Sequence, residues 1–157
     1  DPDLVGSIAT ILAEEQMPAH LLEVELTESL LLEGNADTRQ QVARLKALGL
    51  TLAMDDFGTG YSSLSYLKKF PIDVIKIDRS FIKDIPENED DMEITSAVIA
   101  MAHNLKLKVV AEGIETAAQL GFLRRQQCDV GQGYLFDRPI PGRDLVGSLR
   151  RYPCRGA

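Results

Sequence analysis

Two adjacent carboxylates, Asp55 and Asp56, follow an apolar stretch in the segment AMDDFGTG, and two glycines, Gly58 and Gly60, come soon after them. Neighbouring carboxylates repel each other, and a cation between them relieves that repulsion. The glycines allow the following loop conformations that other residues resist. An isolated Asp-Asp pair is a weak motif, and a merely polar turn explains it as well. The segment therefore raises the hypothesis of a metal site, which the rest of the chain must support.

Polar residues also end the other apolar segments that are typical of strands. They are Glu25 and Glu28 in VELTE, Lys76 and Asp78 in VIKID, Glu112 and Glu115 in VVAEGIE, and Gln132 in VGQGY. Each has a structural explanation by itself, such as a first-turn helix charge for Glu28 or an outward-pointing side chain for Lys76. Coincidence at all five strand ends is harder to explain, because carboxylates gathered at a buried rim destabilise a fold unless they are paired or bound to metal. We therefore favour a binding site.

The donor types indicate which metal such a site would take. Carboxylate oxygens without clustered His or Cys suit Mg²⁺ or Mn²⁺ better than zinc. The two histidines, His20 and His103, fall before a predicted strand and within a predicted helix, so neither is a candidate ligand. A carboxylate that bridges two ions suits in-line phosphoryl displacement. The loop after Asp56 lacks the GxxxxGK[ST] pattern, which argues against a nucleoside-triphosphate site.

Hydrophobic periodicity predicts alternating strands and helices. Strands are expected at residues 21–26, 50–54, 74–77, 109–111 and 130–131, and helices at residues 3–15, 37–48, 62–69, 90–105, 116–126 and 143–151. Such alternation favours right-handed βαβ units around a parallel sheet, whose carboxyl-terminal edge is where ligands bind. The acidic segment 86–91 is interpreted as a solvated loop that leads into a helix, and no close internal repeat is evident.

Composition restricts the possible functions. The 157 residues suit one domain, and 45% hydrophobic with 26% charged residues is ordinary for a soluble globular protein. A net charge of −7 argues against DNA as a partner, whereas a small phosphate ligand remains possible because bound cations supply positive charge. Cys128 and Cys154 show no metal spacing and are predicted to be reduced thiols in a cytoplasmic protein. Neither a membrane segment nor a signal peptide is predicted.

Five motifs carry a resemblance to a known family. The segments ELTES, DDFGTGYSSLSYL, IKIDRSF, VVAEGIET and GQGYLFDRPIP resemble, in order, motifs of the EAL-domain cyclic-di-GMP phosphodiesterases. The resemblance runs from about residue 21 to residue 141. It implies an α/β fold of the (β/α)8 TIM-barrel type. It also implies a bacterial signal-transduction hydrolase that converts cyclic di-GMP to linear pGpG with two Mg²⁺ or Mn²⁺ ions.

The resemblance also implies roles for individual residues. Glu25 and Asp55 would ligate the first metal, and Asp55 would bridge to a second metal that Asp56 also binds. Lys76 would orient the attacking water or help to deprotonate it, and Glu112 would bind metal or act in base chemistry. The resemblance places Gln132 and Asp78 at the substrate and counts Asp56 among the catalytic groups. It assigns support of the loop after the aspartates, with contacts for a homodimer, to Glu28, Gly58, Thr59 and Gly60.

One departure from the family concerns the N-terminal strands. The Glu-Ala-Leu signature and the metal-binding Asn that follows it are absent, and a (β/α)8 barrel takes about 250 residues and eight strands. Residues 1–157 are therefore predicted to be the C-terminal part of a single EAL domain, a partial barrel of about five βα units. By itself the chain is expected to hydrolyse cyclic di-GMP feebly at most and to associate through a sheet edge or the loop after Asp56.

Two functional classes remain open from the sequence. The intact motifs favour an enzyme, whereas the missing ligands favour a non-catalytic cyclic-di-GMP receptor or protein-interaction module if the chain is complete. The resemblance further suggests an upstream sensory or GGDEF-type domain. Missing N-terminal regions could also anchor a longer protein to a membrane.

Overall fold

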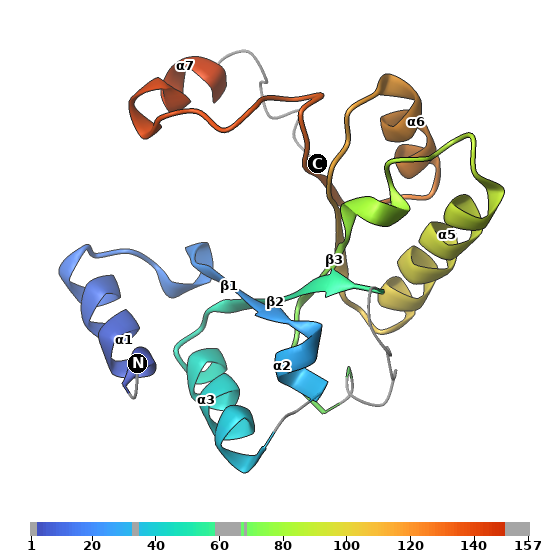
Figure 1. The fold of residues 1–157 in the computed structure, drawn as a ribbon. Helices are drawn as coiled ribbons and strands as arrows, with labels where there is room; N and C mark the ends of the chain where they lie inside the picture. The colour runs from blue at the N-terminus through green and yellow to red at the C-terminus, as the bar shows by residue number, and fades with distance from the viewer. Residues whose placement is uncertain (1–2, 33–34, 59–66, 68, 150–157) are drawn as a thin grey trace.

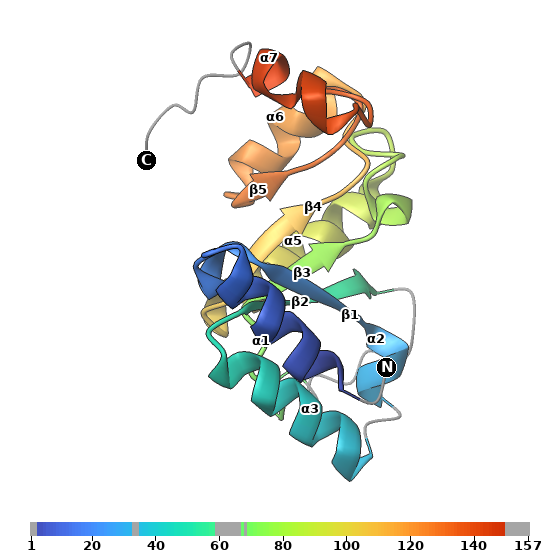
Figure 2. The same ribbon diagram turned by 90° about the vertical axis from the view of Figure 1, so that its left-hand side faces the viewer.

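The computed structural model describes residues 3–32, 35–58, 67 and 69–149. Five parallel strands form one sheet in the order β1-β2-β3-β4-β5. Their bounds are Glu23–Thr27, Thr51–Phe57, Val74–Ile77, Lys108–Ala111 and Val130–Gly131. Figure 2 shows the strands side by side in this order across the sheet. The predicted α/β class and parallel sheet are confirmed, and the arrangement is that of a partial TIM-barrel-like fold.

Helices connect the strands. They are α1 Leu4–Glu14, α2 Glu28–Leu32, α3 Ala36–Ala47, α5 Glu89–Asn104, α6 Ala117–Arg125 and α7 Leu145–Leu149, with 3₁₀ turns η1 Ala19–Leu21, η2 Arg79–Phe81 and η3 Gly142–Asp144. Figure 1 shows α3, α5 and α6 along the outer side of the sheet. Across the described ranges, none of the helices combines the length and apolarity needed to cross a membrane.

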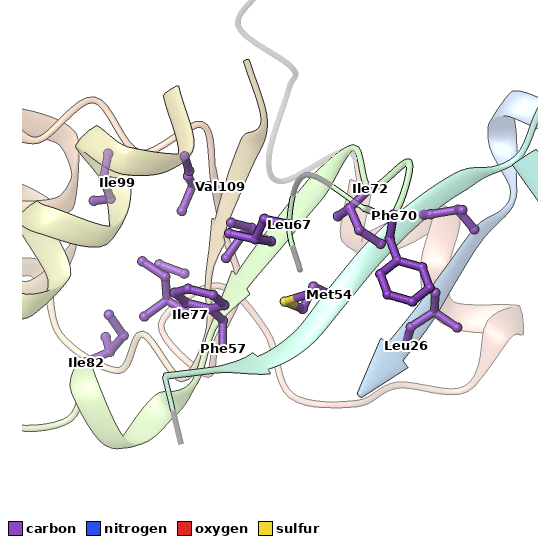
Figure 3. Close-up of a cluster of buried hydrophobic side chains, with 14 of the residues drawn as sticks. Leu26, Met54, Phe57, Leu67, Phe70, Ile72, Ile77, Ile82, Ile99 and Val109 are labelled. Carbon is purple, nitrogen blue, oxygen red and sulfur yellow. The ribbon is translucent and has the colours of Figure 1, made fainter. Parts of the chain in front are cut away.

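Side chains that alternate along the strands form the core between sheet and helices. Leu52, Ile75, Ile77 and Val109 are at most 1% exposed and belong to one continuous apolar cluster. Figure 3 shows Ile77 and Val109 beside Ile99 of α5 in this cluster. Successive strand residues point to opposite faces, so the residues between these apolar positions lie on the inner face. Burial of the outer face thus sets which side chains reach the inner face.

The structure corrects several predicted boundaries. The strand expected at residues 50–54 continues to Phe57, so Asp55 and Asp56 lie within β2 instead of after it. The strand expected at residues 21–26 begins at Glu23, since the preceding residues form η1. Helix α2 was not predicted, because its five residues are too few to show a helical period. At residues 143–151, η3 and α7 replace the single predicted helix up to residue 149.

Two other predictions concern the acidic segment 86–91 and the helix expected at residues 62–69. The acidic segment 86–91 leads into α5, where Asn88 caps the helix and Glu89 lies in its first turn, as expected. Acidic side chains are favourable there because they interact with the partial positive charge of the helix N-terminus. The helix predicted at residues 62–69 falls largely outside the described residues, and so does Cys154.

Candidate functional site

The ammonium group of Lys76 is the centre of a cluster of three carboxylates. Lys76 Nζ lies 2.6 Å from Glu25 Oε1, 3.1 Å from Asp55 Oδ1 and 2.7 Å from Glu112 Oε1. The Lys76 side chain is 7% exposed, whereas that of Glu25 is 49% exposed. The cluster is therefore deep at the lysine and open toward Glu25. It unites four residues that the sequence placed at four separate strand ends.

Strand register explains why these residues meet. Glu25 of β1 pairs with Ala53, and Met54 of β2 pairs with Ile75, so Asp55 and Lys76 are the next residues on neighbouring strands. Lys76 lies between two outward-facing core residues and therefore points to the inner face. Glu112 follows the last residue of β4, and its amide donates to the Ile77 carbonyl at 3.1 Å. Three parallel pairings thus align the four side chains.

The charge state of Lys76 follows from this environment. Burial by itself would lower the pKa of the lysine, but its interactions with Glu112, Glu25 and Asp55 outweigh that effect and raise the pKa above its ordinary value. Lys76 is consequently an ammonium at neutral pH. In this state it can donate hydrogen bonds and neutralise the carboxylates, but it has no lone pair with which to accept a proton.

The two aspartates differ in backbone and exposure. Asp56 has a φ of +55°, and the pairing of β2 with β3 shifts register between Met54 and Phe57. An extra residue of this kind interrupts the alternation of a strand. As a result, Met54 and Phe57 both join the buried core, while Asp55 faces the lysine and Asp56 is exposed. The bulge therefore presents two consecutive carboxylates at one strand end.

Glu28 lies beneath the segment that follows the aspartates. It is the first residue of α2, it is 6% exposed, and its Oε2 accepts the Gly58 amide at 3.4 Å. Gly58 has a φ of +100°, and a Cβ there would lie 2.9 Å from the Phe81 ring. The structure thus brings Glu28 and Gly58 together. Thr59 and Gly60, the other predicted loop residues, lie outside the described residues.

We expect Gly58→Ala to lower the free energy of unfolding by about 1–3 kcal/mol, because a left-handed backbone and a close ring contact both penalise the new methyl group. Urea denaturation measures the change. Gly142→Ala is the matched control, since a Cβ at Gly142 meets nothing within 4 Å. An equal loss of unfolding free energy in both variants would show that neither the backbone φ of Gly58 nor its contact with Phe81 disfavours a side chain at this position.

A cleft of about 200 Å³ adjoins the cluster through Glu112. Its lining also includes Arg79, Glu115, Gln132 and Tyr134. Arg79 pairs with Glu115 at 2.7 Å, and the Arg138 guanidinium lies 4.8 Å from the centre of the Tyr134 ring. Gln132 also lines a hollow of about 330 Å³ on the inner face, together with Glu25 and Lys76. The cleft therefore combines aromatic, cationic and anionic groups beside the carboxylates.

Arg79 and Tyr134 were not among the residues predicted from the sequence. The signal for Arg79 was its place directly after VIKID, since residues after a parallel strand reach the same edge as the strand end. Tyr134 follows Gln132 by two residues, so its position shortly after a predicted strand also indicates that it reaches this edge of the sheet. Each residue follows a polar residue that already ends its motif, Asp78 or Gln132, so the pattern of polar strand ends does not by itself single out Arg79 or Tyr134.

Asp78 is placed differently from the other predicted site residues. Its carboxylate caps the turn η2 by accepting the Ser80 amide at 3.0 Å. The hydrogen bonds from Ser80, opposed by burial, hold the pKa of Asp78 below its ordinary value. The structure therefore brings Asp78 to a backbone turn beside Arg79 and does not bring it into the Lys76 cluster.

The donor chemistry of the cluster fits a hard divalent cation. In the described part of the chain, Asp55 Oδ1 is buried and accepts no hydrogen bond, and it forms an ion pair with Lys76. All candidate donors are carboxylate oxygens, which Mg²⁺ and Mn²⁺ prefer. Over the same residues, no three acidic, His or Cys side chains already surround a single cation position. Lys76 instead provides the central positive charge.

Comparisons with known families and proteins agree with these observations. The family model for the EAL domain matches residues 1–139. The chain is 51% identical over 149 residues to the cyclic di-GMP phosphodiesterase NbdA of Pseudomonas aeruginosa, covering 95% of this chain and 19% of that protein. It is 43% identical over 147 residues to MucR of the same species, a bifunctional diguanylate cyclase/cyclic di-GMP phosphodiesterase, covering 93% of this chain and 21% of MucR. The chain thus spans about a fifth of these curated relatives.

Solved structures show the same fold. The structure of the MucR phosphodiesterase in complex with c-di-GMP superposes with a TM-score of 0.85 at 42% identity, covering 90% of this chain and 57% of that one. The manganese and cyclic di-GMP complex of Klebsiella pneumoniae BlrP1 has a TM-score of 0.82 at 34% identity, covering 88% of this chain and 36% of that one.

Proposed function

Because the chain belongs to the EAL domain family, we propose that it provides the catalytic edge of a metal-dependent phosphodiesterase that hydrolyses cyclic di-GMP to linear pGpG. The observation that carries this proposal is the convergence of Glu25, Asp55 and Glu112 on Lys76. A structural ion pair needs one carboxylate, whereas three carboxylates around one buried lysine leave surplus negative charge. That surplus suits divalent cations and a phosphodiester substrate.

The cations would be Mg²⁺ or Mn²⁺, with Glu25 and Asp55 as ligands of one ion and with Asp55 and Asp56 as ligands of a second. The buried, hydrogen-bond-free oxygen of Asp55 supports this assignment. The bulge at Asp56 supports it too, because it lets consecutive carboxylates serve one site. When bound, the ions would activate a water nucleophile and stabilise the charge that develops on the phosphate.

Lys76, Glu112 and Gln132 would act on water and phosphate. Lys76 is held as an ammonium, which supports orientation of the attacking water and the phosphate over deprotonation. Glu112 faces both the lysine and the cleft, so it is available as a metal ligand or as a proton acceptor. Gln132 lines the cleft and the inner hollow, where its amide can hold water and phosphate oxygens.

The surrounding groups would support the substrate and the loop. Glu28 would brace the segment at Gly58 that follows the metal ligands. Asp78 would contribute to substrate binding through η2, which it caps and which carries Arg79 into the cleft.

We further propose that residues 1–157 form the C-terminal part of an EAL domain in a cytoplasmic homodimer. MucR, whose name joins a diguanylate cyclase to a phosphodiesterase, supports the idea of an upstream GGDEF-type domain. The five strands leave β1 and β5 as the sheet edges within the described residues, which supports the presence of further strands in the complete domain.

Hydrolysis of cyclic di-GMP by the complete gene product tests this proposal. We expect conversion to pGpG with Mn²⁺ or Mg²⁺ and loss of conversion with excess chelator, measured by chromatography of the nucleotides. Calorimetric titration of cyclic di-GMP gives the second readout. Metal-dependent binding without conversion would support the receptor alternative, and absence of both would refute the proposed function.

A further inference from the structure

The side chain of Gln119 uses its full hydrogen-bonding capacity although it is almost completely buried. Gln119 is the third residue of α6 and is 3% exposed. Its Oε1 accepts the amides of Glu115 at 2.7 Å and Thr116 at 2.9 Å. Its Nε2 donates to the carbonyls of Ile82 and Lys83, each at 3.1 Å. An amide oxygen accepts two hydrogen bonds and an amide nitrogen donates two, so these four bonds satisfy the whole group.

Half of this arrangement is an ordinary helix cap. Thr116 precedes α6, its side chain accepts the Gln119 amide at 3.2 Å, and the Gln119 side chain accepts the Thr116 amide in return. Such a capping box satisfies backbone donors at the start of a helix and stabilises that helix by itself. Capping requires only the oxygen of the Gln119 side chain. The two bonds that Nε2 donates are therefore additional to the cap, and they reach a different segment of the chain.

That segment follows β3 and carries Arg79. The turn η2 begins at Arg79, and the amides of Ile82 and Lys83 donate to the Arg79 carbonyl at 3.0 and 2.9 Å. The last carbonyls of a helical turn lack partners within it, and here Gln119 provides the partner of two of them. Figure 1 shows this green segment beside α6. Gln119 thus holds the end of the turn whose first residue is Arg79.

The cleft of about 200 Å³ is built from the loops after three neighbouring strands. Its lining comes from the segments that follow β3, β4 and β5. In chain order the lining residues are Arg79, then Glu112, Gly113 and Glu115, then Gln132, Gly133 and Tyr134. The shape of the cleft therefore depends on how these three loops are held against one another.

The loops after β4 and β5 are held together by backbone contacts at Ile114. Its amide donates to the Gln132 carbonyl at 3.0 Å, and its carbonyl accepts the Leu135 amide at 2.9 Å. A Cβ at Gly133 would collide with the Ile114 backbone, so the two segments approach closely. The loops after β3 and β4 meet through side chains instead, namely through the Arg79–Glu115 ion pair and through Gln119.

Exposure decides which of these two side-chain contacts holds the loops after β3 and β4 together. The side chains of Arg79 and Glu115 are 59% and 43% exposed, and an ion pair that is open to water to this degree contributes little stability. The hydrogen bonds of Gln119 lie in the interior, where they are stronger and where an unmet polar group is costly. Gln119 therefore sets the distance between the loops, and the ion pair depends on that distance.

Gly113 shows how closely the two loops approach. It has a φ of +72°, and a Cβ there would collide with the aliphatic part of the Arg79 side chain. Arg79 therefore lies directly across the backbone of the loop after β4, with its guanidinium at Glu115. A shift of one loop relative to the other would move this guanidinium within the cleft.

We propose that Gln119 is a positioning residue for the cleft: it joins the loop after β4 to the turn that begins at Arg79, and so holds the Arg79 guanidinium and Glu115 together on one wall. The described lining of the cleft does not include Gln119, which acts through these two residues without touching a bound nucleotide. The consequence for the reaction rests on the proposed function, whereas the link between the loops rests on the contacts alone.

The position of Glu112 is set separately from this wall. The cleft adjoins the Lys76 cluster through Glu112, whose amide donates to the Ile77 carbonyl at 3.1 Å. Loss of the Gln119 link would therefore displace Arg79 more than Glu112. We expect nucleotide binding to weaken more than the chemical step, so that KM rises while kcat is largely kept.

Gln119→Glu separates the two roles of the side chain. A glutamate keeps the oxygen that accepts the amides at the start of α6, but it replaces the Nε2 donor by an oxygen that faces two carbonyls. Thr116→Ala is the matched control, because it removes a hydroxyl from the capping box and leaves both bonds of Nε2 in place.

Amide hydrogen exchange of the complete protein, without metal or nucleotide, measures the link. The amides of Ile82 and Lys83 report on the turn, and the Thr51 amide of β2, which donates to the Leu22 carbonyl at 3.1 Å, is the reference. A change in global stability affects all three amides and cancels in the ratio. In Gln119→Glu we expect protection of the turn relative to the reference to fall about three- to tenfold, as for the loss of an ordinary hydrogen bond.

Gln119→Met keeps the test decisive if a carboxylate at this buried position prevents folding. Methionine has a similar length and no charge, and it removes all four hydrogen bonds, so protection at Glu115 and Thr116 should fall together with that at Ile82 and Lys83. Unchanged protection at Ile82 and Lys83 would overturn the proposal, and so would an equal loss there in Thr116→Ala.

Steady-state kinetics with cyclic di-GMP and Mn²⁺ measure the consequence for the site. We expect Gln119→Glu to raise KM about three- to tenfold and to change kcat less than about twofold, and Thr116→Ala to change neither. A fall in kcat at constant KM would overturn the assignment of Gln119 to the cleft wall. If the complete protein neither binds nor hydrolyses cyclic di-GMP, the proposed function fails, and hydrogen exchange decides the link between the loops independently.

Discussion

Replacing Asp55 by asparagine is expected to lower the hydrolysis of cyclic di-GMP by the complete protein at least about 100-fold. The amide keeps the shape of the side chain but removes the charge of the one carboxylate assigned to both ions. It also removes a partner of the Lys76 ammonium. Initial rates at saturating Mn²⁺, together with Mn²⁺ affinity by calorimetry, measure the effect.

Asp90→Asn is the matched control for this substitution, because Asp90 is an exposed carboxylate in the first turn of α5. Its hydrolysis rate should equal that of the unmodified protein. Near-normal turnover of Asp55→Asn at saturating Mn²⁺ would contradict the assignment of Asp55 as a bridging ligand.

Replacing Lys76 by methionine is expected to destabilise the metal-free protein by about 2–3 kcal/mol. Three carboxylates would then face one another without the central ammonium. Breaking a fully buried ion pair costs about 3–5 kcal/mol, and the exposure of Glu25 reduces that figure here. Urea denaturation in the presence of a chelator measures the loss.

Divalent cations should reverse this loss. With the ammonium removed, the carboxylates have no competing cation, so Mn²⁺ should stabilise Lys76→Met more than it stabilises the unmodified protein. Lys46→Met is the control, because Lys46 and Asp73 are each about one third exposed. Loss of their ion pair should lower the free energy of unfolding by about 1 kcal/mol or less, and Mn²⁺ should not restore it. A Lys76→Met protein as stable as the unmodified protein in chelator would show that the cluster holds no surplus charge.

The polar strand ends are the part of the site that the sequence predicted best. Glu25, Asp55, Lys76 and Glu112 each follow or end an apolar segment, and parallel strands bring such positions to one edge. This prediction needs only local information, namely hydrophobic periodicity and the polar residues that interrupt it. The parallel sheet follows from the same pattern, since strands that alternate with helices have few other arrangements.

Other features depended on contacts between distant segments. The sequence did not reveal that Asp78 caps η2 while Lys76, two residues earlier, collects three carboxylates. Nor did it predict the end of β2, because the bulge at Asp56 arises from pairing with β3 and from the burial of Phe57. Predicting either feature requires the register between strands.

Short segments of the sequence define which residues are available at the carboxyl edge of the sheet, because alternation along a strand and turn composition are local properties. Which of these residues meet depends on the register of neighbouring strands, and that register is a property of the folded chain. The hydrogen-bonded pairs Lys46–Asp73 and His103–Asp129 are the clearest case, since 27 and 26 residues separate their members. No local pattern joins such residues. They meet because buried apolar faces hold α3 and α5 against the sheet, and that packing places each helix end beside the start of a strand.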